Sequence, residues 1–326
     1  MHLLVVDDNP SILEILETFI ESLTDHTVET ALSVADALDL LARPEATAFD
    51  CFLLDIQMPG TDGIELCKIL RGRPDHKHTP ILMLTAMSEK SYIDQAFKAG
   101  ASDYITKPFD VVQLRGRLGL VDSLLAGRKK QSHVPNLAKS NADADAGKKS
   151  LALYEPYWVQ DVDGVIEYFA LENYVSLLSS KRLFESAVFA FSIRGIEDLY
   201  ENTSPSEYEC LITGVSEAIS SCLETHQFLA SYAGSGSFVC IVEDGWQPDP
   251  KVLMHRVNMT LSLMELSFDD GTRMNIEVSS GDIIRMERTS GDKAVDALAA
   301  AFDSAEKASG SHAINLENIR YSKQSA

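Results

Sequence analysis

The chain of 326 residues is longer than one ordinary domain and suits two. Hydrophobic residues make up 45% of it and charged residues 24%, which is typical of globular chains that bury real cores. The longest apolar runs are strand-sized and the N-terminus has no signal-peptide pattern. We therefore expect neither a membrane span nor export, and we predict a cytoplasmic protein.

The formal net charge of −21 is spread unevenly along the chain. Residues 1–125 carry 20 acids and 10 bases, which gives −10, whereas residues 151–326 carry 27 acids and 12 bases, which gives −15. A folded half this acidic repels phosphate backbones. Nucleic acid is therefore not an expected partner, and a transcription factor is the least favoured class.

The first part of the chain alternates short apolar runs with amphipathic segments. The runs predicted to be strands are Leu3–Val6, Thr27–Ala31, Phe49–Leu54, Ile81–Thr85 and Asp103–Thr106. Between them, apolar residues step at three and four positions, Ser33 and Ser88 are placed as helix N-caps, and Gly100 as a C-cap. Five such units in series predict a doubly wound α/β fold with a five-stranded parallel sheet.

The second half has a different pattern, α+β, that follows a segment without periodicity. We predict a first domain over residues 1–125, a linker over 126–152 and a second domain over 153–326. The predicted strands are Ala187–Ile193, Phe228–Tyr232, Phe238–Glu243 and Met274–Gly281, and the predicted helices are Tyr208–Leu223, Pro250–Leu266 and Lys293–Ala308. The order β-α-β-β-α-β-α predicts a ferredoxin-like palm.

Three carboxylates end predicted strands: Asp7 and Asp8 follow the first strand, and Asp55 follows the third. The carboxyl ends of parallel strands meet at one edge of a sheet, where ligands bind. Clustered carboxylates repel one another unless a cation lies among them, and Mg²⁺ takes carboxylate and phosphate oxygens. Thr85 and Lys107 follow the fourth and fifth strands, where they can bind a phosphoryl group by a hydroxyl and a positive charge.

These residue types suit phosphoryl transfer to an aspartate, with Asp55 as the nucleophile. Each residue alone could be an isolated polar strand end, but five of them at matching strand ends favour a common task. The stretches VVDDNP, LLDIQMPGTDG, LTA and SDYITKPF closely resemble the receiver domains of two-component response regulators, a flavodoxin-like fold, over about residues 1–123.

This resemblance implies a role for each residue of the set. Asp55 would be the phosphoacceptor, and Mg²⁺ would bind to Asp7, Asp8, Asp55 and the backbone carbonyl of Gln57. Thr85 would be the switch hydroxyl, Lys107 the phosphate-binding cation and Tyr104 the switch aromatic, although Tyr104 could instead be a core aromatic. The partner implied is a sensor histidine kinase or a phosphotransfer protein, whose phosphohistidine donates to Asp55.

The second half resembles a degenerate GGDEF (diguanylate cyclase) domain over about residues 165–320. Leu171-Glu-Asn173 and Val278-Ser-Ser-Gly281 match short stretches of that family. Gly234, Ser235, Gly236, Ser237 and Phe238 stand where the Gly-Gly-Asp/Glu-Glu-Phe hairpin would be, and Ser192 replaces the metal-binding Asp of the first strand. Neither serine nor glycine supplies the negative charge that holds two metal ions, so cyclase activity is expected to be absent.

Two interpretations of the second half are compatible with the sequence. In the first, the receiver controls an inactive cyclase-like domain that acts by protein contact, with an unknown downstream protein or a second copy of the chain as partner. In the second, the domain is an unusual nucleotide cyclase or a nucleotide-binding regulator. The Gly234–Ser237 stretch fits a tight hairpin turn with positive φ better than a phosphate cradle, because it lacks the lysine of a P-loop.

Overall fold

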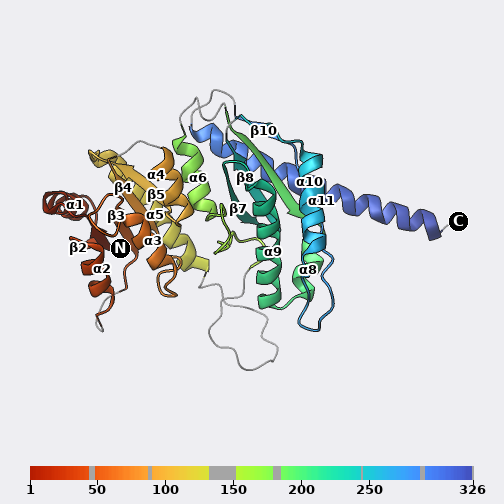
Figure 1. Cartoon of the computed structure of the whole chain (residues 1–326), viewed down its shortest axis with the longest axis horizontal. Coiled ribbons are helices and arrows are strands. Elements are labelled where there is room, and N and C mark those ends of the chain that lie inside the picture. Colours follow the sequence, from red (N-terminus) through yellow and green to blue (C-terminus); the bar gives the residue numbers. More distant parts are fainter. Residues whose placement is uncertain are drawn as a thin grey trace. The chain divides into compact units, whose positions relative to one another are not determined.

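The computed structural model describes residues 1–43, 48–86, 90–131, 152–178, 185–243, 245–286 and 291–324. The chain divides into two compact units, Met1–Ala146 and Gly147–Ala326 (Figure 1). The predicted linker lies mostly outside the described residues, except that residues 126–131 continue the last helix of the first unit. Among the described residues, no helix has both the length and the hydropathy that crossing a membrane requires.

The first unit is built around a parallel sheet, as predicted. Its strands are β1 (His2–Val6), β2 (Thr27–Ala31), β3 (Cys51–Asp55), β4 (Ile81–Thr85) and β5 (Asp103–Thr106). Their order is β2-β1-β3-β4-β5, and every neighbouring pair is parallel. This is the doubly wound, flavodoxin-like arrangement.

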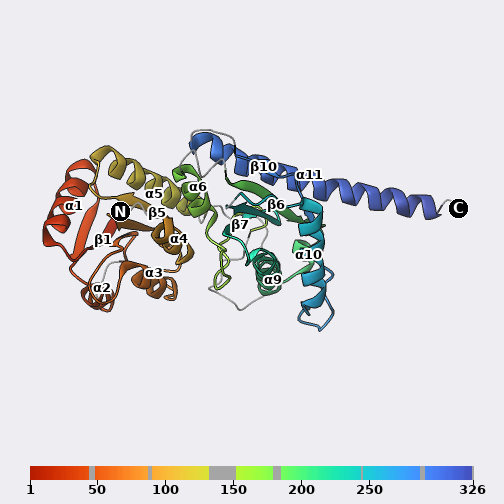
Figure 2. The same cartoon turned by 45° about the horizontal axis from the view of Figure 1, so that its top comes forward.

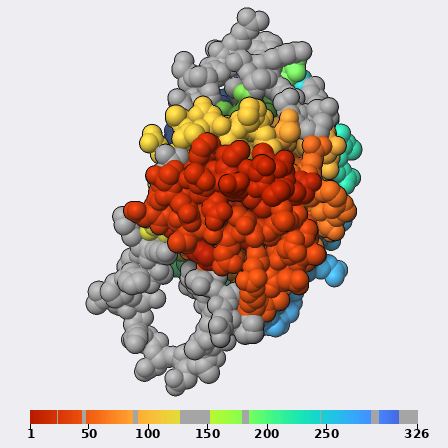
Figure 3. All heavy atoms as spheres, turned by 90° about the vertical axis from the view of Figure 1, so that its left-hand side faces the viewer, coloured from red at the N-terminus to blue at the C-terminus, as the bar shows by residue number. Residues whose placement is uncertain are grey.

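Helices cover both faces of this sheet (Figure 2). They are α1 (Pro10–Leu23), α2 (Val34–Leu41), α3 (Gly63–Arg71), α4 (Lys90–Lys98) and α5 (Val111–Gln131). Leu3 and Val5 of β1 face the core with α1 and α5, whereas Leu4 and Val6 face the core with α2 and α3. Burial on both faces explains why these strands are continuous apolar runs. Figure 3 looks onto this unit, and its early residues, in red and orange, form most of the visible face.

The helix caps Ser33 and Gly100 of this unit lie where the sequence predicts them, but one strand begins later. Ser33 caps α2 by accepting the backbone N–H of Asp36, and Gly100 follows α4 with a φ of 99°. The third strand begins two residues later than predicted, at Cys51, and Asp50 before it bonds to His2 of β1 by both its backbone N–H and its side chain. Ser88, the predicted cap of α4, lies outside the described residues.

The second unit contains an antiparallel sheet between helices. Its strands are β6 (Ala187–Ile193), β7 (Phe228–Gly234), β8 (Ser237–Val242), β9 (Val278–Ser280) and β10 (Ile284–Arg285), in the order β10-β6-β8-β7 with β9 also paired to β6. Its helices are α6 (Tyr168–Leu177), α8 (Ile196–Asn202), α9 (Pro205–Leu223), α10 (Pro250–Leu263) and α11 (Gly291–Gln324). Figure 2 shows the sheet between α9 and α11.

The predicted strand Met274–Gly281 is wrong in its first half. β9 pairs with β6 only from Val278, which lies opposite Ile193, the last residue of β6. Before Val278, the Glu277 carbonyl still accepts the Arg194 N–H at 2.9 Å, and Arg273 forms an isolated antiparallel bridge with Ser267, but no strand continues there. Met274 instead donates its backbone N–H to Leu266, which closes a turn. The prediction also placed the end of α10 three residues too late, ended α11 too early and missed α6 and α8.

Candidate functional site

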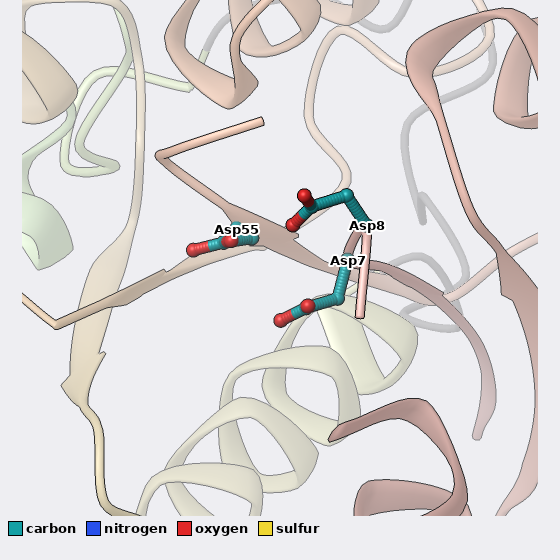
Figure 4. A group of neighbouring side chains, drawn as sticks. All are labelled: Asp7, Asp8 and Asp55. Atoms are coloured by element: carbon teal, nitrogen blue, oxygen red, sulfur yellow. The ribbon is translucent and has the colours of Figure 1, made fainter. Parts of the chain in front are cut away.

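The carboxylates of Asp7, Asp8 and Asp55 gather at the carboxyl edge of the parallel sheet (Figure 4). β1 and β3 are neighbours with Val6 opposite Leu54, so the residues that follow, Asp7 and Asp55, come together. The carboxylate oxygens of the three residues lie within 4.8 Å of one another. Asp7 and Asp55 are buried, whereas Asp8 is exposed and so can reach a ligand from the solvent side.

Lys107 is the cation of this edge. Its Nζ lies 2.6 Å from Asp7 Oδ2 and 3.0 Å from Asp55 Oδ1, so one ammonium group bridges both buried carboxylates. Its backbone N–H donates to the carbonyl of Thr85 at 2.7 Å, which ties the segment after β5 to the end of β4. The following Lys107–Pro108 peptide bond is cis.

Thr85 and Tyr104 occupy the two strands on the other side of Asp55. Asp55 pairs with Leu84, so Thr85 is one position further toward the sheet edge, and its side chain is fully buried. Tyr104 is half-buried on β5, and its ring meets the Phe97 ring edge-on at a centroid distance of 6.3 Å. The structure thus brings Thr85 to the acidic edge, and it packs Tyr104 against α4.

Burial dominates the electrostatics of Asp55, which is 4% exposed. Loss of solvent raises the pKa of its carboxyl group, and the Asp7 charge adds to that effect. Lys107 and a hydrogen bond from the Gln57 backbone act in the opposite direction, but they do not outweigh burial. Three acids with one lysine leave an excess of negative charge, so the donor set fits a divalent cation with oxygen ligands, as Mg²⁺ requires.

Gly63 is a residue of this site whose physical role the sequence did not reveal. It begins α3 directly behind Asp55, and its N–H donates to the Ile56 carbonyl at 3.1 Å. A Cβ atom at this position would lie 2.0 Å from the backbone oxygen of Asp55. The loop after β3 can therefore turn back this tightly only with glycine here.

The N-terminal unit is similar in sequence to known proteins. Residues 3–119 match the family model of the response regulator receiver domain. The N-terminal unit is a receiver domain. It is 41% identical over 107 residues to the transcriptional regulatory protein ResD of Bacillus subtilis, which is 33% of this chain and 42% of ResD.

Two further similarities cover the same region of the receiver domain. The response regulator PleD of Caulobacter vibrioides is 36% identical over 117 residues, which is 36% of this chain and 25% of PleD. The solved structure of the chemotaxis protein CheY4 of Vibrio cholerae is 32% identical over 37% of this chain and 97% of its own, with a TM-score of 0.34. The chain thus spans less than half the length of ResD or PleD. Receiver domains interact with histidine kinases or phosphotransfer proteins, and they use Mg²⁺ at an acidic cluster of this kind.

The residues of the second unit that the sequence analysis compared with a cyclase hairpin also come together, but they carry no charge. Ser192 of β6 lies opposite Ser237 of β8, and both side chains are buried. The β7–β8 turn consists of Ser235 and Gly236, with φ of 51° and 71°, which is the twist that two-residue hairpins favour. Hence the glycine-rich stretch forms a tight turn, as the sequence indicated.

The backbone donors of this turn bind within the protein. The Gly236 N–H donates to the Tyr232 hydroxyl at 3.1 Å, and the Ser235 N–H donates to the Leu153 carbonyl at 2.7 Å. A Cβ at Gly234 would lie 2.7 Å from the Tyr154 carbonyl oxygen, so the start of the second unit lies directly against the turn. A phosphate bound at this turn would have to displace these contacts.

Proposed function

We propose that the chain is a two-component response regulator in which Asp55 accepts a phosphoryl group from a sensor histidine kinase or a phosphotransfer protein. Mg²⁺ would be held by Asp7, Asp8, Asp55 and the Gln57 carbonyl. The single observation that carries the proposal is the bridge from Lys107 to two buried carboxylates at the edge where a receiver domain binds its ligands. The metal would supply positive charge to the phosphoryl oxygens.

The chemistry of the transfer uses the groups that the structure gathers. A carboxylate oxygen of Asp55 attacks phosphorus, the phosphorus–nitrogen bond of the phosphohistidine breaks, and its electron pair stays on the imidazole. The product is an acyl phosphate that adds negative charge to an already acidic edge. Lys107 lies within 3.0 Å of Asp55 and would offset part of that charge.

The resulting signal would pass through Thr85 and Tyr104. The Thr85 hydroxyl would donate to a phosphoryl oxygen, and the space it leaves would admit the Tyr104 ring. Tyr104 contacts Phe97 of α4, so a rotation of its ring would alter the surface of α4, β5 and α5. This is a local change of charge that shifts the population of a two-state element.

For the second unit we propose a GGDEF-like output domain without cyclase activity, which acts by protein contact. We place the receiver over residues 1–125, the linker over 126–152 and the output domain over 153–326. The uncharged pair of Ser192 and Ser237 supports this, because two metal ions need carboxylate ligands. The occupied N–H groups of Ser235 and Gly236 support it too. The partner of this output domain would be a downstream protein or a second copy of the chain.

Acetyl phosphate with Mg²⁺ tests the phosphoacceptor. We expect the wild type to gain one acid-labile phosphoryl group, seen by mass spectrometry of the intact protein, and Asp55→Asn to gain none. Asp75→Asn is the matched control, because Asp75 is an exposed carboxylate elsewhere in the same unit. Equal labelling of wild type and Asp55→Asn would contradict the assignment.

Incubation with GTP and Mg²⁺ tests the output domain. We expect no dinucleotide product from the wild type, with or without phosphorylation. Formation of a cyclic dinucleotide would instead support the alternative, a nucleotide cyclase with altered metal ligands.

A further inference from the structure

Helix α10 carries a second apolar face in addition to the one it buries. Leu253, Val257 and Leu261 lie in the core of the second unit. Val252, Met259 and Leu263 point elsewhere and are 56%, 53% and 79% exposed. Leu263 is the most exposed large hydrophobic side chain of the part of the chain that the structure describes. Such exposure on one helix is typical of a surface that binds a partner.

The spacing of this face is that of a coiled-coil seam. The seam consists of Val252, Arg256, Met259 and Leu263, which follow one another at four, three and four residues. These side chains lie within about 60° of one another around a helix axis. Alternation of four and three is the arrangement by which side chains of one helix insert between those of another. α10 packs against α9 (Figures 1 and 2).

Helix α10 is basic, whereas the half of the chain that contains it is acidic in total. Lys251, His255 and Arg256 are exposed, and the helix contains no acidic residue between Pro250 and Leu263. The half of the chain that contains it has 27 acids and 12 bases. Because Arg256 lies inside the seam, a bound helix would desolvate its guanidinium group, which is costly unless a carboxylate meets it.

A second copy of α10 is a poor occupant for this reason. In an antiparallel pair, Val252 would face Leu263 and Arg256 would face Met259 of the other copy. Two Arg256 side chains would then lie in adjacent layers, and neither helix has an acid to pair with them. A helix with acidic residues meets both the apolar and the electrostatic requirement.

We propose that the seam on α10 binds an amphipathic helix of another protein, with apolar residues at heptad spacing and a Glu or Asp opposite Arg256. This rests on the proposed function of the second unit, action by protein contact, and states the chemistry of the partner. A short helix pair of this kind gives a transient interaction, which suits signalling.

Fluorescence anisotropy of the full, unphosphorylated chain with labelled helical peptides tests the proposal. One peptide has about three heptads with Leu at the a and d positions, except for one Glu at a central a or d position that would face Arg256, and the other peptide has Lys in place of that Glu. We expect the acidic peptide to bind about tenfold tighter. Leu263→Glu should weaken its binding about tenfold, and Arg256→Glu should reverse the preference between the peptides.

Ile15→Glu is the matched control, because Ile15 is an exposed apolar residue of α1 in the other unit, and binding should not change. Thermal unfolding shows whether each variant is folded. Equal binding of both peptides, or binding that Leu263→Glu leaves intact, overturns the proposal. So does a concentration-dependent dimer that Leu263→Glu abolishes, because the occupant is then a second copy. Incubation with GTP and Mg²⁺ tests the function proposed for the second unit separately, so failure of the seam is distinguishable from failure of that function.

Discussion

The receiver edge and the β7–β8 turn are both places where strands end and polar residues meet, yet they differ in charge. At the first, the Lys107 ammonium group lies within 3.0 Å of a carboxylate oxygen of Asp7 and of Asp55. At the second, Ser192 and Ser237 are neutral and buried, and the N–H groups of the turn donate to Tyr232 and Leu153. Convergence of strand ends is therefore not sufficient for a site. A site for a metal ion or a phosphoryl group also requires charged side chains that the rest of the protein neutralises only in part.

The largest expected effect of a substitution at either place is the loss of phosphoryl labelling when Lys107 is removed. Lys107→Ala leaves two buried carboxylates without their cation, so the pKa of Asp55 rises further and the new phosphoryl charge is not offset. We expect labelling by acetyl phosphate to fall about 100-fold or more, measured as an initial rate. Lys98→Ala, on the exposed end of α4, should label like the wild type. A wild-type rate in Lys107→Ala would show that the metal alone provides the charge.

A change at Gly63 tests whether the acidic edge depends on its backbone support. Gly63→Ala forces a Cβ against the backbone oxygen of Asp55, where neither atom can move aside easily. We expect a loss of about 3 kcal/mol in the free energy of unfolding, measured with urea, and weaker Mg²⁺ binding.

Gly72→Ala is the control for Gly63, because a Cβ there meets its nearest atom only at 3.6 Å. Its free energy of unfolding should be close to that of the wild type. Equal stability of the two variants would refute the role given to Gly63.

Asp103 shows how a buried carboxylate behaves away from the acidic edge. Desolvation raises its pKa to about 6, and the Arg117 guanidinium at 2.9 Å offsets this only in part. The folded state thus binds the proton more tightly than the unfolded state, so stability falls as the pH rises from about 4 to about 6. We expect Asp103→Asn to remove a pH-dependent loss of unfolding free energy on the order of 3 kcal/mol in that range. Urea midpoints across this pH range measure it, and an unchanged slope would exclude Asp103 as its source.

The smallest effect is expected at the turn of the second unit. Gly236→Ala and Gly245→Ala both place a side chain at positive φ, but only the first also collides with Ile196, at 2.6 Å. We expect Gly236→Ala to lose about 1 kcal/mol more in the free energy of unfolding. Equal losses would mean that the turn is not packed, and it would then be free to receive a ligand.

Much of the first unit could be predicted because each of its strands can be identified from a short stretch of sequence. Buried parallel strands are continuous apolar runs, and parallel strands place their following residues at one edge. Asp7, Asp55 and Thr85 were therefore expected together, and the sheet order brings them together. Their roles in phosphoryl transfer stay predictions.

The second unit was less predictable because the ends of its strands depend on segments that are far away in the sequence. β9 begins at Val278, opposite Ile193, the last residue of β6, and this limit is set by a strand far away in the sequence. The Leu153 carbonyl accepts the Ser235 N–H from a segment much earlier in the sequence, and no local pattern predicts this contact.

By itself, the sequence determined where strands and helices alternate in the first unit and which residue types follow the strands. It also determined the net charge of each half, because all of these depend on composition and spacing. Only the tertiary structure decided which polar groups bind one another and which apolar faces stay exposed. The seam on α10 illustrates the difference. Its spacing is visible in the sequence, but whether the core or the solvent receives Leu263 depends on packing against α9, and packing requires the whole fold.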